Sequence, residues 1–290
     1  MNLSYVFRRF HRELYKSVSK IGLKQSRANY FGLDLKVPII HGLGTGFLVP
    51  GDKWMSDCLA VFLKQKKGAI VDVGVNVGLY LVKLKALDQA REYIGFEPNA
   101  ICNYYTQKLI RANNFQEVRI FPFALSDKKE MRTFYVQRDA DKMGSLNDYA
   151  RFGDTNKFGF DLVTFPADEV FEMLSPDALC AFKIDVEGAE FEVLQGLAST
   201  IVKYKPYIFC EIWQLPDIEH PTYKEKRDRL EKIRELMRSI NYKILGVSLD
   251  DASDIMLLET IEDFNTSCRW DYILVHESEA KKMCNELSNI

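Results

Sequence analysis

Apolar and polar positions follow two different periods along this chain. Short apolar runs, rich in branched and aromatic side chains, predict strands over 69–73, 93–97, 118–123, 132–137, 178–185, 207–213, 242–247 and 272–275. Stretches with an apolar residue every three or four positions predict helices over 54–64, 79–90, 100–113, 168–174, 187–204 and 225–240. Strands that alternate with helices pair in parallel, so we expect an α/β protein built as a three-layer sandwich.

The N-terminal part of the chain has a different pattern. Residues 1–27 carry seven basic side chains and one acidic one, interleaved with apolar residues, which predicts a basic amphipathic helix. We expect this helix to pack on its own domain with its basic face in solvent; weak contact with an anionic membrane surface is the alternative. Residues 1–53, which are rich in Gly and Pro after residue 30, then form a lead-in to one domain over 54–290. A polar insertion at about 131–165 is expected to form a lid or acceptor wall.

Composition and charge narrow the class of protein. The 290 residues are 47% hydrophobic and 28% charged, as in ordinary globular proteins. A formal net charge of -2 gives no electrostatic reason to expect nucleic acid as a partner. The six cysteines form no C-x-x-C pair, and no apolar run reaches the ~18–20 residues that span a bilayer. Because the N-terminus also lacks a signal-peptide pattern, we expect a cytoplasmic protein with reduced thiols.

A tight turn follows the first strand of the predicted domain. Asp72 lies near the end of that strand, and Gly74, Asn76 and Gly78 follow it. Glycine permits positive φ and lets a ligand approach the backbone. A dinucleotide site would have G-x-G-x-x-G here, with the pyrophosphate at the start of the next helix. The carboxylate of Asp72 would instead repel a pyrophosphate and suit a ligand with positive charge, such as S-adenosylmethionine.

Carboxylates lie at the ends of several predicted strands. They are Asp72, Glu97, Asp127, Asp185 with Glu187, and Glu211. In parallel α/β sheets the carboxyl ends of the strands share one edge, where ligands bind. Like charges gathered there shift one another's pKa values, which is typical of functional sites. Single members of the set, such as Asp127 and Glu187, could alternatively cap helices or turns. Glu97 is placed to accept hydrogen bonds from both ribose hydroxyls of a nucleoside.

Four motifs in this order resemble those of the FkbM-type S-adenosylmethionine-dependent methyltransferases. They are VDVGVNVGLY at 71–80, GFEPN at 95–99, ALSD at 124–127, and FKIDVEGAE at 182–190 with VLQG at 193–196. The segment 206–211, which begins with proline and ends with glutamate, is similar to the strand that follows in that family. The resemblance implies a Rossmann-like class I methyltransferase sandwich, with seven mostly parallel strands and an antiparallel last strand.

The resemblance also implies roles for individual residues. The cofactor would be S-adenosylmethionine, with its methionine end shaped by Asp72, Gly74, Asn76 and Gly78. Its ribose would be held by Glu97 within the motif that includes Pro98 and Asn99, and its adenine edge by Ser126 and Asp127. The reaction would be O-methylation. We expect Asp185 to act as the base or to orient the acceptor, with Glu187 and Glu211 in support and Lys183 neutralising the carboxylates.

The acceptor is the least determined part of this hypothesis. The family resemblance favours a hydroxyl of a small molecule or glycan, above all a sugar of a surface polysaccharide. Aromatic residues of the insertion could stack on such an acceptor or simply pack the insertion: Tyr135, Tyr149, Phe152 and Phe158. A divalent metal between Asp185 and Glu211 is a further alternative that we do not favour. The competing functions are a non-catalytic S-adenosylmethionine sensor, a nucleic-acid methyltransferase and an NAD enzyme.

Overall fold

The structure is a computed structural model. It describes residues 24–40, 42–48, 51, 53–136, 146, 158–213, 215–248, 255–260 and 268–289. The basic helix predicted before residue 24 lies outside this set, as do Tyr149 and Phe152 of the insertion. Within the set, no helix is long and apolar enough to cross a membrane.

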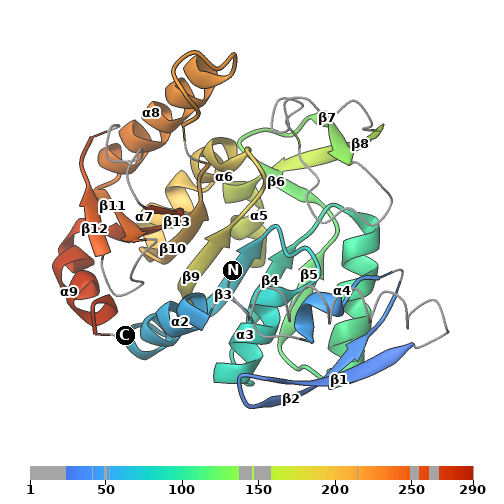
Figure 1. Cartoon of the computed structure of the whole chain (residues 1–290). Helices are drawn as coiled ribbons and strands as arrows, with labels where there is room; N and C mark the ends of the chain where they lie inside the picture. The colour runs from blue at the N-terminus through green and yellow to red at the C-terminus, as the bar shows by residue number, and fades with distance from the viewer. Residues whose placement is uncertain are drawn as a thin grey trace.

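An eight-stranded sheet forms the middle layer (Figure 1). In spatial order its strands are β12 (Ile255–Leu258), β11 (Tyr242–Ser248), β13 (Cys268–His276), β10 (Tyr207–Glu211), β9 (Leu179–Ile184), β3 (Ala69–Val73), β4 (Tyr93–Phe96) and β5 (Val118–Phe121). The five from β10 to β5 are parallel, and β13 runs antiparallel between β10 and β11. The predicted α/β sandwich with an antiparallel last strand is therefore confirmed.

The number of strands differs from the seven that were predicted. The eighth, β12, pairs antiparallel with β11 at the edge of the sheet. Only Leu258 of its four residues is buried, and Leu257 is exposed, because an edge strand has a neighbour on one side only. Four apolar residues with no alternation carry no clear strand period, which is why the sequence pattern did not reveal this element.

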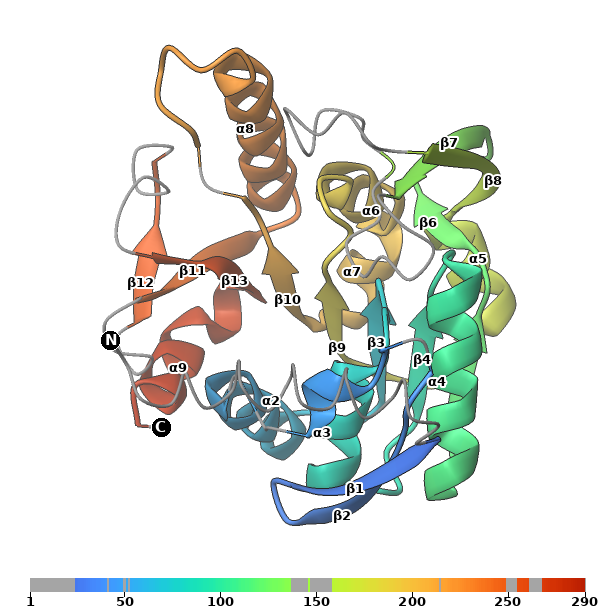
Figure 2. The same cartoon turned by 45° about the vertical axis from the view of Figure 1, so that its right-hand side comes forward.

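Helices cover both faces of the sheet and complete the three layers (Figure 2). On one face lie α2 (Lys53–Gln65), α3 (Leu79–Leu87) and α9 (Glu277–Leu287). On the other lie α5 (Ala167–Leu174), α6 (Glu190–Gly196), α7 (Ala198–Tyr204) and α8 (Tyr223–Ser239). The apolar stripe of α8 buries Leu230, Ile233 and Met237, as its period predicts. The helix α9 was not predicted from the sequence.

The helix expected over 187–204 is wrong in two respects. Glu187 and Gly188 have φ values of 55° and 103°, which a right-handed helix excludes, so α6 begins only at Glu190. The helix also ends at Gly196, whose backbone lies against the chain of β6 (Ala124–Ser126). A Cβ on Gly196 would lie 2.0 Å from the carbonyl oxygen of Ser126, so only glycine permits this approach. The chain then continues as α7 after Leu197.

Two smaller units lie beside the sandwich. A hairpin of β1 (Gln25–Tyr30) and β2 (Leu33–Pro38) packs on α3 and on α4 (Ala100–Asn113), which places part of the predicted lead-in in the domain core. Strands β7 (Met131–Val136) and β8 (Phe158–Pro166) form a sheet with β6. The insertion therefore begins and ends as paired strands, and β8 is a strand where a polar loop was expected.

Candidate functional site

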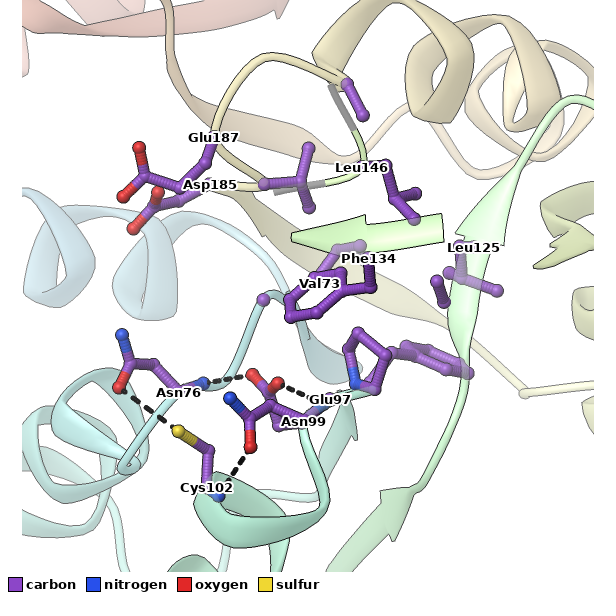
Figure 3. Close-up of a pocket in the computed structure, with 16 residues that line it drawn as sticks. Val73, Asn76, Glu97, Asn99, Cys102, Leu125, Phe134, Leu146, Asp185 and Glu187 are labelled. Carbon is purple, nitrogen blue, oxygen red and sulfur yellow. Dashed lines mark hydrogen bonds between the residues drawn. The ribbon is translucent and has the colours of Figure 1, made fainter. Parts of the chain in front are cut away.

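A cavity lies where the strands β3, β4 and β9 end (Figure 3). It encloses about 670 Å³ when the space open to solvent is counted. Seven of the predicted site residues line it: Gly74, Asn76, Glu97, Pro98, Asn99, Asp185 and Glu187. Figure 3 shows the carboxylates of Asp185 and Glu187 pointing to the same side of the view, opposite to Leu125 and Leu146.

The turn after β3 is fixed by backbone packing. Gly74 has φ 89°, and a Cβ there would lie 2.0 Å from the carbonyl oxygen of Asp185. The backbone N–H of Asp185 donates in turn to the carbonyl of Val73 across 3.1 Å. Asn76 continues the turn at φ 54°, and the hydroxyl of Thr106 donates to its carbonyl across 2.9 Å. The turns after β3 and β9 are therefore held in direct contact.

Glu97 joins this turn to the start of α4. Its Oε2 accepts a hydrogen bond from the backbone N–H of Asn76 at 2.6 Å, and its Oε1 accepts one from that of Asn99 at 2.8 Å. Asn99 also caps α4 by accepting from the N–H groups of Ile101 and Cys102. Burial raises the pKa of Glu97 to about 7, although the two N–H donors oppose this shift. Each oxygen keeps a lone pair for a ligand hydroxyl.

Asp72 is placed differently from the other predicted site residues. Its side chain is fully buried and does not line the cavity. The hydroxyl of Tyr93 donates to its Oδ2 at 2.5 Å, and Nζ of Lys183 lies 3.3 Å from its Oδ1. Burial raises the pKa of Asp72, and the charge of Lys183 and the Tyr93 hydrogen bond oppose that effect. Its closest partners are therefore protein groups behind the cavity.

Three carboxylates gather around the turn after β9. Asp185 and Glu187 line the cavity, and Glu211 ends the neighbouring strand β10. Glu211 itself does not line the cavity. Burial, together with the negative charges of Asp185, Asp271 and Glu187, raises the pKa of Glu211 to about 9. Glu211 therefore retains its proton to a higher pH than an ordinary glutamate, and in the protonated form it can donate a hydrogen bond. No group of three His, Cys, Asp or Glu side chains that could hold a metal ion occurs in the described part of the chain.

The remaining predicted contacts lie beside the cavity rather than in its lining. Gly78 precedes α3 at φ 86°, where a Cβ would meet Thr106 and Leu109 of α4. Ser126 is buried and lies 3.2 Å from Asp127, between its Oγ and Oδ1. The two residues before Ser126, in the same motif, do line the cavity: Ala124 and Leu125.

Several lining residues were not identified from the sequence. The apolar side of the cavity includes Phe134 of β7 and Leu146 of the insertion, and Cys102 of α4 completes the side near Asn76. Phe134 lies in the strand predicted over 132–137. The alternation of apolar and polar residues predicts that strand, but it does not show which of its two faces turns towards the cavity. Leu146 is an isolated apolar residue in a polar stretch, and only the tertiary structure brings it to the cavity. Tyr135, the neighbour of Phe134, is not in the lining.

The donor set around the cavity decides which ligand it suits. Its polar groups are carboxylates and amides, and no Lys, Arg or His side chain lines it within the described ranges. Such a site offers nothing to balance the charge of a pyrophosphate. It does suit a ligand with ribose hydroxyls facing Glu97 and a positive charge near Asp185 and Glu187. The residues present therefore fit S-adenosylmethionine.

Comparison with known proteins agrees with this assignment. The family model described as Methyltransferase FkbM domain matches residues 72–244, which is more than half of the 290-residue chain. No curated protein matches the chain. Solved structures similar to it include a methyltransferase FkbM from Methylobacillus flagellatus, with 16% identity over 72% of this chain and a TM-score of 0.44. This chain spans only 44% of that protein's length.

In two further solved structures the match extends over a larger share of the other protein. One is a putative caffeoyl-CoA O-methyltransferase from Staphylococcus aureus, with 11% identity, 91% of each chain covered and a TM-score of 0.45. The other is the SAH-bound methyltransferase PaMTH1 from Podospora anserina, with 10% identity, 77% of each chain covered and a TM-score of 0.41.

Proposed function

The chain belongs to the FkbM methyltransferase family, and on this premise we propose that it transfers the methyl group of S-adenosylmethionine to a hydroxyl group. The observation that carries the proposal is the placement of Asp185. Its carboxylate lines the same cavity as Glu97 and Asn76, so an acid-base group and the cofactor contacts share one site. An oxygen acceptor has to lose a proton during transfer, and a carboxylate at this place can receive it.

The residues that would hold the cofactor follow from the lining of the cavity. Glu97 would accept hydrogen bonds from the ribose hydroxyls, and the turn from Gly74 to Asn76 would face the methionine end. Leu125 and Phe134 offer apolar surface to the adenine ring. When bound, S-adenosylmethionine supplies a methyl group on a sulfonium, which is activated for displacement by an oxygen atom.

The protein's own contribution to the reaction is mainly positional. Holding the acceptor oxygen in line with the methyl group accounts for most of the rate gain in such a displacement. We assign Asp185 as the base that takes the hydroxyl proton, with Glu187 orienting the acceptor beside it. Glu211, neutral because its pKa is raised to about 9, would act as a hydrogen-bond donor rather than as a second base.

We further propose that the acceptor is a sugar hydroxyl, in a small molecule or a glycan. Phe134 and Leu146 give the cavity an apolar wall next to its carboxylates. Sugars present both kinds of surface, because their C–H faces pack on apolar side chains while their hydroxyls bond to carboxylates. A surface-polysaccharide sugar is the acceptor that the family resemblance favours.

We place the reaction in the cytoplasm. Three buried cysteines carry free thiols: Cys58, Cys180 and Cys210. Unpaired, buried thiols are typical of proteins that work in a reducing compartment. Fractionation of the producing cell, with the enzyme followed by antibody, would test this placement.

Two measurements test the proposed function. S-adenosylmethionine and S-adenosylhomocysteine should each raise the melting temperature, because a ligand at a hundred times its Kd adds about 2.7 kcal/mol of stability. NAD serves as the control and should have no effect. Methyl-labelled cofactor is then offered to sugars, polysaccharides, phenols and amines in parallel, and label is expected on hydroxyl acceptors. Transfer confined to amines would overturn the assignment of an O-methyltransferase.

The role of Asp185 has its own variant. Asp185→Asn keeps the shape of the side chain but removes its ability to accept a proton. We expect turnover to fall by about 10²–10⁴-fold, the usual contribution of a positioned base, while cofactor affinity changes little. Turnover equal to that of the wild type would exclude Asp185 as the base.

A further inference from the structure

Lys183 is a buried cation that contacts three separate parts of the site. Its ammonium donates a hydrogen bond to the carbonyl of Gly74 at 2.9 Å. It forms ion pairs with Asp185 at 3.1 Å and with Asp72 at 3.3 Å. The ammonium thus donates to the turn after β3 and lies beside two carboxylates, one in the turn after β9 and one inside the sheet.

The strand register explains how these groups meet. Asp72 of β3 is the direct partner of Lys183 on β9 and of Gly95 on β4, so the three positions share one face of the sheet. Gly95 leaves room on that face, since a Cβ there would lie 2.5 Å from Val75, 2.8 Å from Ile120 and 3.0 Å from the ring of Tyr93. The Tyr93 hydroxyl therefore reaches Asp72 from two residues further back on β4.

Charge compensation keeps this buried group ionised. Burial alone would lower the pKa of Lys183, but the negative charges of Asp185 and Asp72 outweigh it and raise that pKa above its ordinary value. Asp72, in turn, accepts a hydrogen bond from Tyr93 and faces the ammonium. A buried ion pair with this many partners is sensitive to the removal of any one of them.

We infer that Lys183 is a positioning residue, which fixes the carboxylate of Asp185 relative to the Gly74 turn and so aligns the base with the methyl donor. Asp72 and Tyr93 serve the same end, because Asp72 faces the ammonium from the side away from the cavity and the Tyr93 hydroxyl donates to Asp72. This inference rests on the proposed function, since it takes Asp185 as the base.

The contacts of Lys183 indicate how much its loss should slow the reaction. Lys183 touches both the turn that would seat the methionine end of the cofactor and the carboxylate that would receive the proton. Without the ammonium, the two carboxylates lose their common counter-charge and Asp185 is free to turn away. A misplacement of about 1 Å in a reacting geometry costs about 10²-fold in rate.

The experiment compares five variants of the full chain. Lys183→Met keeps the length of the side chain without its charge, and Asp185→Asn and the double variant complete a mutant cycle. Tyr93→Phe removes only the hydroxyl that holds Asp72. Tyr242→Phe is its matched control, because that buried hydroxyl donates to the carbonyl of Pro206 at 2.8 Å instead of to a carboxylate of the network. Melting temperature, cofactor Kd and kcat are measured for each.

We expect Lys183→Met to lower kcat by about 10²-fold with a much smaller change in cofactor Kd. In the Asp185→Asn background the same change should have almost no further effect on kcat, because Lys183 acts through Asp185. Tyr93→Phe should lower kcat while Tyr242→Phe, with a similar loss of melting temperature, leaves kcat unchanged. If Lys183→Met does not fold, the two tyrosine variants still decide the question.

Two results would overturn the inference while leaving the proposed function intact. One is a full, independent loss of kcat from Lys183→Met in the Asp185→Asn background. The other is an equal kcat for Tyr93→Phe and Tyr242→Phe. By contrast, wild-type turnover in Asp185→Asn alone would contradict the proposed base itself, so the two failures are distinguishable.

Discussion

The backbone N–H of Asn76 lies 2.6 Å from Oε2 of Glu97, so the turn after β3 and the carboxylate after β4 are bonded to each other. This bond sets the orientation of Glu97 before any ligand arrives. It also means that the protonation state of Glu97 affects both the turn and the ribose contact that we assign to it.

Cofactor affinity should therefore depend on pH. Burial raises the pKa of Glu97 to about 7, and only its ionised form accepts hydrogen bonds from both ribose hydroxyls with both oxygens. Binding then favours the ionised form, so affinity should rise as the pH increases through about 7. Calorimetric titration should show that the cofactor binds about tenfold more weakly at pH 6, one unit below that pKa, than at pH 8.

Glu97→Gln provides the control for this pH dependence. The amide cannot ionise, so the cofactor Kd of this variant should be nearly constant between pH 6 and pH 8. At pH 8 it should be higher than the Kd of the wild type. A wild-type affinity that is constant over this range would contradict the assignment of Glu97 as the ribose acceptor.

Glu211→Gln should keep most of the wild-type turnover at pH 7. The pKa of Glu211 is raised to about 9, first by burial and then by Asp185, Asp271 and Glu187, so its side chain is already neutral there. Glutamine reproduces a neutral group that donates a hydrogen bond. Steady-state kinetics beside Asp185→Asn tests the contrast, and an equal loss in both variants would show that Glu211 acts as an ionised carboxylate.

The same substitution should stabilise the fold in a pH-dependent way. Below the unfolded pKa of ~4.3, Glu211 is protonated in both states and causes no penalty. As the pH rises from there towards about 9, the unfolded chain releases the proton while the folded chain retains it, so the wild type loses stability. The difference in melting temperature between Glu211→Gln and the wild type should therefore grow from pH 4 to pH 8.

Gly74→Ala should destabilise the protein far more than Gly32→Ala. Both glycines have φ 89°, so both substitutions carry the same backbone strain. At Gly32 a Cβ meets nothing within 4 Å, whereas at Gly74 it would lie 2.0 Å from the carbonyl oxygen of Asp185. Strain at positive φ costs about 1 kcal/mol or more, and the clash adds to it only at Gly74. Urea denaturation of both variants measures the difference in unfolding free energy. Equal losses of stability would show that the turn after β3 is not in contact with the turn after β9.

Local signals in the sequence predicted the framework of this site. The Gly-containing turn and the carboxylates that follow the strands are each decided by residues within a few positions of one another. These features are in the predicted order at one edge of the sheet. Asp185 and Glu187 accordingly line the same cavity as Glu97.

The features that were missed depend on residues far apart in the chain. The burial of Asp72 follows from its register with Lys183, 111 positions later in the sequence numbering, and from the space that Gly95 leaves for Tyr93. The break at Gly196 depends on the backbone of Ser126 lying against it. Leu146 reaches the cavity from a stretch whose composition is polar. Periodicity along the sequence cannot predict these contacts, because each one forms only when separate elements pack together.

The position of β13 has a consequence for how the chain acquires its structure during synthesis. This strand, which follows every other described strand in the sequence, lies between β10 and β11, so each of these two lacks one of its two neighbours until β13 has left the ribosome. Synthesis proceeds at about 5–20 residues per second, so β11, already paired with β12, keeps its other edge exposed for seconds before β13 covers it. Nascent chains halted before residue 268 should therefore remain sensitive to protease in β11, and chains released with β13 should become resistant.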